Sequence, residues 1–157
     1  MFFQPNLGQT CGALKDAIGA SDDVSAALMH TVLDLVAPRC ATPDRAARIT
    51  RINALIEAEA WSDAALAIAA LDRAHAVRRI VRDDGEWYCT IGSQWPVPDW
   101  LDHNTWYSHP VLPLAIMGAV VDALSQNESA APAATWRQLP GREHGDAIAS
   151  FGCDNYC

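Results

Sequence analysis

Hydrophobic positions in the first half of the chain repeat at the period of an α-helix. Between Ser21 and Pro38 an apolar residue returns every three or four positions, which indicates one buried helical face. Ser21 is a favoured N-cap residue, and Pro38 cannot continue a helix. We therefore expect a helix over residues 22–37. Its buried face consists of Val24, Leu28, Val32, Leu35 and Val36.

Two further helices are expected in quick succession. Thr42 is a good N-cap residue and Pro43 suits the first helical turn, so the next helix should cover residues 43–59. Ser62 then provides a cap for a helix over residues 63–72. The very short turn between the two helices predicts a helical hairpin. The expected core positions of the first of them are Ile49, Ile52, Leu55 and Ile56.

The pattern then changes to that of β-structure. Residues 77–82 and 86–91 are rich in β-branched and aromatic side chains, and Asp83-Asp84-Gly85 lies between them. A three-residue loop that ends in glycine is typical of a β-hairpin, because glycine tolerates a positive φ. We therefore expect an antiparallel β-hairpin over residues 77–91.

A last helix is expected over residues 110–125, after a segment that we interpret as irregular. Two prolines and two tryptophans within residues 95–100 are incompatible with a regular helix or a central strand. Residues 126–157 read as a linker and a cysteine-ending tail. The expected fold is therefore mainly α, with four helices and one antiparallel β-hairpin in a single domain over residues 1–125. For residues 1–20, where three glycines weaken a short helical pattern, helix and coil both remain open.

Composition and charge narrow the classes of function. The 157 residues suit one domain, half of them are apolar, and the net charge is −8. This charge disfavours binding to nucleic acid or to an anionic membrane, because both depend on clustered cations. We find no uninterrupted apolar stretch of membrane-spanning length and no signal peptide. Together with five scattered cysteines, an odd number, these features predict a cytoplasmic protein, and they leave a homo-oligomer possible.

One block of the sequence resembles a group of small, uncharacterised bacterial proteins. The block contains Asp-Asp-Gly-Glu-Trp-Tyr-Cys over residues 83–89 and Ser-His-Pro-Val-Leu-Pro-Leu-Ala-Ile over residues 108–116. The resemblance covers about residues 49–124, and the hairpin phrase is its most distinctive part. Because no activity is known for the group, the resemblance implies the architecture and supplies no catalytic residues.

An aromatic segment is the strongest candidate for a binding surface. Six tryptophans occur in the chain, and four of them fall within residues 87–106. Tryptophan and tyrosine combine a large apolar area with a polar group, and they dominate the energetics of protein interfaces. The alternative is that these rings close a small core where the hairpin meets the helices. The candidate partner-binding residues are Trp87, Trp95, Trp100, Trp106 and Tyr107.

The arginines form a second candidate. Arg45, Arg48 and Arg51 recur every three residues in one expected helix, and Arg78, Arg79 and Arg82 lie in the expected hairpin. If these side chains converged, they would hold a phosphate or an acidic partner. The alternative is a solvated face whose arginines pair with nearby acids.

Two weaker candidates involve thiols and histidines. Cys153 and Cys157, with His144 as a third ligand, are candidates for a soft metal ion or for thiol chemistry. Asp102, His103 and His109 lie in the irregular segment, where they are candidates for an active-site cleft. No phosphate-binding glycine loop, dinucleotide-binding pattern or nucleophile motif is present.

The sequence therefore favours a non-enzymatic protein that acts as an accessory or regulatory subunit. It would bind another protein through the aromatic and proline-rich residues 87–107, with no cofactor. The alternatives are a thiol or metal-binding protein and a small enzyme with a tryptophan- and histidine-lined cleft.

Overall fold

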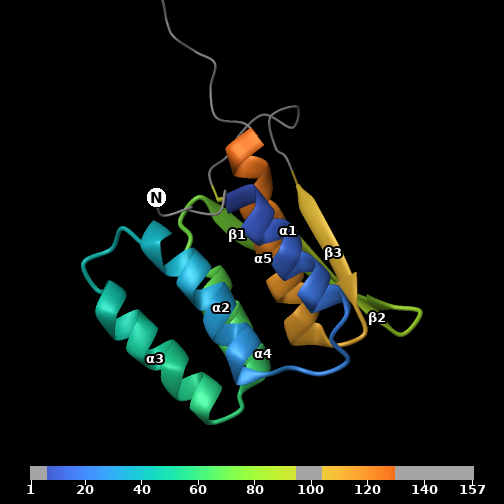
Figure 1. The fold of residues 1–157 in the computed structure, drawn as a ribbon, viewed down its shortest axis with the longest axis horizontal. Helices are drawn as coiled ribbons and strands as arrows, with labels where there is room; N and C mark the ends of the chain where they lie inside the picture. The colour runs from blue at the N-terminus through green and yellow to red at the C-terminus, as the bar shows by residue number, and fades with distance from the viewer. Residues whose placement is uncertain (1–6, 95–103, 130–157) are drawn as a thin grey trace, which may run out of the picture.

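A computed structural model of the protein describes residues 7–94 and 104–129 (Figure 1). Within these residues the chain forms five α-helices, one short 3₁₀-helix and one antiparallel sheet of three strands in the order β1-β2-β3. In chain order, the elements are α1 (Leu7–Gly19), α2 (Ala26–Val36), η1 (Ala37–Arg39), α3 (Arg45–Glu57), α4 (Trp61–Ala69), β1 (His75–Asp83), β2 (Glu86–Ser93), β3 (Thr105–His109) and α5 (Leu112–Ser129).

This architecture is an α+β fold, so the prediction of four helices with one hairpin is wrong. The first additional element is α1, in a region whose glycines had left helix and coil open. The buried residues Cys11, Leu14 and Ile18 lie on one face of α1. Burial of this face against α5, which α1 contacts, outweighs the low helix propensity of glycine.

The second additional element is β3, inside the segment that the sequence had suggested to be irregular. Thr105 pairs with Ile91 of β2, and His109 pairs with Trp87. Both Thr105 and His109 are buried, whereas Trp106 between them is exposed, which is the alternation expected of a strand covered on one face. The strand depends on this pairing with β2, a long-range contact that a local pattern does not reveal.

The expected hairpin is confirmed, with a tighter turn than predicted. Asp83 pairs with Glu86, so the loop consists only of Asp84 and Gly85. Both residues have positive φ, 46° and 88°, and this combination is typical of the two-residue turn that matches the twist of a hairpin.

The helices that the capping pattern predicted exist, but their ends differ from the expected ones. Helix α2 begins after Ser25, whose hydroxyl oxygen accepts a hydrogen bond from the Leu28 N–H at 3.2 Å. Helix α4 begins at Trp61, so Ser62 lies inside it instead of capping it. Helix α5 continues to Ser129, and it therefore includes the first residues of the expected linker. The remainder of that linker and tail, residues 130–157, lies outside the described residues.

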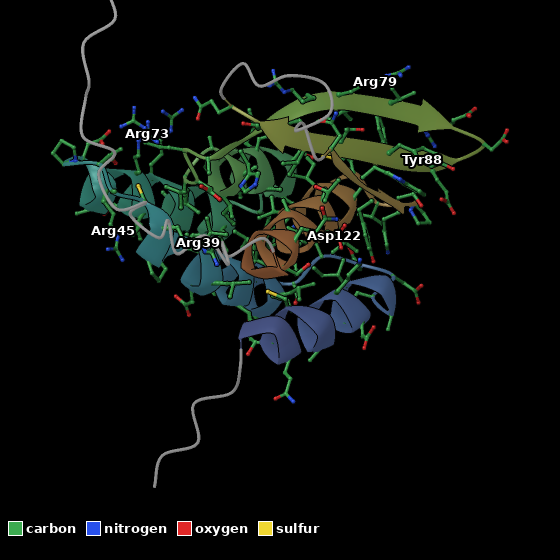
Figure 2. The ribbon with its side chains drawn as sticks, turned by 90° about the horizontal axis from the view of Figure 1, so that it is seen from above. Arg39, Arg45, Arg73, Arg79, Tyr88 and Asp122 are labelled. Carbon is green, nitrogen blue, oxygen red and sulfur yellow. The ribbon has the colours of Figure 1, made fainter. Side chains whose placement is uncertain are left out.

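Helix α5 forms the centre of the hydrophobic core. It contacts α1, α4, β2 and β3. Figure 2 shows the strands along one side of the molecule, α1 on the opposite side and α5 between them. The largest fully buried side chains of α5 are Leu114, Ile116, Met117, Val121 and Leu124. Ile52 and Ile56 of α3, which the sequence placed on a buried face, are each 2% exposed.

One glycine allows the sheet to approach α5 closely. A Cβ atom at Gly118 would lie 2.2 Å from Cδ1 of the Tyr107 ring on β3. Only a residue without a side chain permits this contact, because carbon atoms are in ordinary van der Waals contact at about 3.5–4.0 Å. Gly118 therefore determines how β3, and with it Trp106, sits on the helical layer.

Candidate binding surface on the outer face of the sheet

The sheet has one face against the helices and one face that no helix covers in the part of the chain that the structure describes. Cys89 and Ile91 of β2 are buried beneath the sheet. Tyr88 and Thr90, which alternate with these two residues along β2, point to the opposite face, because successive side chains of a strand face opposite directions. We call this the outer sheet surface. Its members are Arg79 and Val81 of β1, Tyr88 and Thr90 of β2, and Trp106 of β3.

The strand register brings these side chains together in two rows. Thr90 pairs with Arg79 on one side and with Trp106 on the other. Val81 pairs with Tyr88. Directly paired residues on one face have Cβ atoms about 4.5–5.5 Å apart, so the five side chains form one continuous patch. Arg79 points away from the helices (Figure 2).

Trp106 is the most exposed large apolar side chain among the described residues, at 64%. Its ring lies beside that of Tyr88, with 6.3 Å between the ring centroids and 34° between the planes. This separation is within the range at which aromatic rings attract each other. The pair presents an apolar surface to solvent with the tyrosine hydroxyl as a polar group.

A shallow depression of about 240 Å³ lies beside this pair. Val81, Tyr88 and Thr90 line it, and it has a cation at Arg79 and an anion at Asp83. Neither of these two groups forms a salt bridge within the described residues. The depression therefore combines an apolar floor with two charges of opposite sign at its edge.

Two of the predicted partner-binding residues lie on the other face of the sheet. Trp87 packs against the core, and the Arg82 guanidinium lies 5.5 Å from the centroid of its ring. Tyr107 packs against α5, and burial raises the pKa of its phenol. Neither ring belongs to the outer sheet surface. The aromatic segment thus divides between core and surface, as strand alternation requires.

Several other candidate residues lie outside the described residues. These are Trp95, Trp100, Asp102, His103, His144, Cys153 and Cys157. Where the chain is described, no group of three or more histidine, cysteine, aspartate or glutamate side chains could hold a metal ion. His109 is 7% exposed, and its Nδ1 accepts a hydrogen bond from the Val111 N–H at 3.0 Å. This bond gives His109 a structural role in the turn before α5.

The two groups of arginines do not converge. Those of the sheet have separate local roles: Arg78 donates a hydrogen bond to the carbonyl oxygen of Ser93, Arg82 covers Trp87, and Arg79 lies on the outer sheet surface. On α3, Arg48 forms a salt bridge with Asp44, with 3.0 Å between Nε and Oδ2. A single phosphate site that joins the two groups is therefore not formed.

Sequence reasoning missed a hydrogen-bonded aspartate–histidine pair at the junction of α4 and β1. His75 Nδ1 lies 2.9 Å from Asp72 Oδ2, and the second Asp72 oxygen accepts a hydrogen bond from the Ala74 N–H at 2.9 Å. Burial opposes ionisation of Asp72, but these hydrogen bonds outweigh it and lower the pKa of the carboxyl group. The sequence signal that could have predicted this contact was an aspartate and a histidine three residues apart in a turn.

The chain matches no known protein-family model, curated protein or solved structure. Within the described residues, none of the helices is long and apolar enough to cross a membrane.

Proposed function

We propose that this protein binds another protein through the outer sheet surface, with Trp106 as the anchoring residue. The observation that carries the proposal is the 64% exposure of Trp106 beside Tyr88. A large apolar ring in water is costly, at about 25 cal/mol per Å² of apolar surface. A partner that covers the ring recovers this free energy, so the exposed tryptophan favours association.

The surroundings of Trp106 support a protein as the partner. Interface hot spots are enriched in tryptophan, tyrosine and arginine, and the outer sheet surface contains one of each: Trp106, Tyr88 and Arg79. Arg79 and Asp83 offer opposite charges at the edge of the depression. This arrangement selects a partner with complementary charges around an apolar centre, as in an accessory or regulatory subunit.

The position of β3 adds a second mode of contact. β3 is at one edge of the sheet, because the strand order is β1-β2-β3. An edge strand can accept a strand of the partner through backbone hydrogen bonds, while neighbouring pockets hold alternate side chains of that strand. Trp106 lies on this edge strand and would contact such a partner directly.

We further propose a cytoplasmic location. Cys40 and Cys89 are buried thiols that form no disulfide with each other. Reducing compartments preserve thiols in this state, which supports the cytoplasm over an oxidising environment.

Affinity measurements on a Trp106→Ala variant test the proposal. The full chain is first used to capture a partner from extract of its own cells, and the dissociation constant of the purified partner is then measured. We expect Trp106→Ala to lose about 2 kcal/mol of binding free energy, or about 30-fold in affinity. Its unfolding free energy should change by about 1 kcal/mol or less, because the side chain is mostly exposed.

Trp87→Ala is the matched control for this experiment. Trp87 packs against the core, so its truncation should reduce the unfolding free energy by up to about 3–5 kcal/mol. Affinity of the folded fraction should not change. If Trp106→Ala unfolds the domain, or binds the partner as tightly as the natural chain does, the outer sheet surface is not the interface.

A further inference from the structure

We infer that a second docking surface lies between α3 and α4 and that it takes an acidic amphipathic helix of a protein partner. The two helices follow each other directly in the chain and contact each other. A groove of about 580 Å³ runs between them. This surface is separate from the outer sheet surface, and the inference does not depend on the proposed function.

The floor of the groove is apolar and incompletely covered. Ile52 is buried, and Leu55 is half-buried. Leu66 is 39% exposed, and it is the only large apolar side chain besides Trp106 that is exposed within the described residues. The side chains of α4 and its C-cap that line the groove beside Leu66 include two alanines, Ala67 and Ala70. Leu66 therefore stands out from a surface of small side chains, where an apolar ridge of a partner can pack beside it.

The walls of the groove differ in charge. Arg48 and Arg51 line the side formed by α3, and Asp63 lines the side formed by α4. Arg48 is held in place, because it forms a salt bridge with Asp44 and its Nη1 donates a hydrogen bond to the Ala70 carbonyl oxygen at 3.3 Å. This second bond ties α3 to the end of α4.

Arg51 differs from Arg48 because it forms no salt bridge within residues 7–94 and 104–129. It is exposed and lies one turn further along α3. Its guanidinium group is therefore available for a carboxylate of a partner, which it can bind through two parallel hydrogen bonds.

The charge of α3 itself also favours carboxylates on the partner. The whole chain has a net charge of −8, yet α3 contains three arginines and only one glutamate. Figure 2 shows Arg39, Arg45 and Arg73 at the same end of the molecule as α3. Of the three charged side chains that line the groove, two are arginines and one is Asp63, so the α3 side of the groove attracts and orients carboxylates of a partner.

An amphipathic helix is the segment that fits a groove between two helices. Such a helix places side chains at positions i, i+3, i+4 and i+7 on one face, and this ridge packs into an apolar groove. The charges of the walls determine its orientation. Carboxylates of the partner belong on the flank that faces Arg51, and neutral or basic side chains belong on the flank that faces Asp63.

Selection from a phage-displayed library of helical peptides against the full chain tests the inference even though the natural partner is unidentified. We expect the enriched peptides to be amphipathic, with an apolar ridge and glutamates or aspartates on one flank. Their affinities are then measured by fluorescence anisotropy for the natural chain and for the variants Leu66→Ser and Arg51→Glu. Each variant should weaken binding by about tenfold or more, because each removes a central contact.

Three further variants identify the surface that is responsible. Asp63→Asn should weaken those selected peptides that have a basic side chain on the flank that faces α4, because it removes the opposite charge, and it should leave the other peptides unchanged. Arg79→Glu and Trp106→Ala alter the outer sheet surface and should leave the affinities unchanged. Circular dichroism and thermal unfolding establish that every variant is folded, as expected for exposed positions.

Several outcomes would overturn the inference. One is that the enriched peptides lack either the acidic flank or the amphipathic pattern. Another is that the selected peptides bind Leu66→Ser and Arg51→Glu as tightly as they bind the natural chain. Loss of peptide binding in Trp106→Ala would assign the peptides to the outer sheet surface instead. A dimer of the natural chain that Arg51→Glu dissociates would show that a second copy occupies the groove.

Discussion

At the scale of single residues, strand alternation separates side chains that are adjacent in the sequence. Trp106 and Tyr107 are neighbours, yet Trp106 is 64% exposed, whereas Tyr107 packs against Gly118 of α5. Trp87 and Tyr88 divide in the same way, with Trp87 against the core and Tyr88 on the outer sheet surface. The segment of high aromatic density therefore contributes side chains both to the core and to the outer sheet surface. The choice between core and surface was made residue by residue, by the direction of each side chain.

Cys89 leads to a prediction about the pH dependence of stability. Burial raises the pKa of its thiol from 9.0 to about 11. The folded state thus favours the neutral thiol, and the resulting stabilisation is fully present below pH 9. As pH rises from 9 towards 11, the unfolded chain loses its proton first and the stabilisation disappears. Urea unfolding across this range should show a steeper loss of stability for the natural chain than for Cys89→Val.

The comparison with Cys89→Val removes the contribution of the other groups that titrate in the alkaline range, such as Tyr107. Valine retains the apolar character of this site and has no thiol to ionise. Parallel stability curves for the two proteins between pH 9 and 11 would contradict the prediction.

At the scale of the elements, local signals and tertiary contacts contributed differently to each helix and strand. Helices α2, α3 and α4 and the β1–β2 hairpin were predicted, because caps, turn residues and periodicity act within a few residues. Helix α1 and strand β3 were not, because their stability comes from distant partners. Helix α1 packs on α5, and β3 pairs with β2 and packs on α5.

Two glycines in helices should respond oppositely to the same substitution. A Cβ atom at Gly118 of α5 would overlap the Tyr107 ring, whereas a Cβ atom at Gly12 of α1 would meet no described side chain within 4 Å beyond its own chain neighbours. Gly12→Ala should stabilise the protein by about 0.5–1 kcal/mol, because alanine has the higher helix propensity. Gly118→Ala should destabilise it by about 1–3 kcal/mol through overpacking.

Chemical denaturation of the two variants, measured against the natural chain, checks this prediction. Near-ultraviolet circular dichroism would also report a displaced Tyr107 ring in Gly118→Ala. If Gly118→Ala were as stabilising as Gly12→Ala, the close approach of β3 to α5 would be incorrect.

At the scale of the whole molecule, the structure places α5 between α1 and the sheet (Figures 1 and 2). Every residue of α5 from Leu114 to Val121 is buried, including Gly118, which lies against the Tyr107 ring. Helix α3, by contrast, has only two buried residues, Ile52 and Ile56. The stable centre of the molecule is therefore separate from the α3–α4 groove, where exposed arginines and Leu66 leave a surface for a partner.

This difference predicts a gradient of local stability. Amide hydrogen exchange should be slowest in α5, at a rate set by global unfolding, because α5 contacts four other elements. The amides of α3 should exchange faster, through local opening. Exchange followed by mass spectrometry or nuclear magnetic resonance measures both regions in one experiment. Equal protection of α3 and α5 would show that the two helices unfold as a single unit.

The sequence by itself determined the local features of this protein. Ile52 and Ile56 were correctly assigned to a buried face, and the hairpin turn was predicted at Asp83-Asp84-Gly85, one residue longer than it is. Side-chain periodicity and turn conformation are properties of short segments. The acidic net charge and the concentration of aromatic residues were equally visible. Each of these observations rests on residues that are close together in the chain.

Only the tertiary structure decided the fold class and the composition of the candidate surfaces. Whether a side chain of β3 is covered depends on α5, and the α3–α4 groove depends on how two helices pack. Leu66 and Ile68 both belong to the apolar pattern of α4, yet Leu66 is 39% exposed and Ile68 is fully buried. Burial is a property of contacts between distant segments, so residues of one chemical type acquire different roles according to what packs against them.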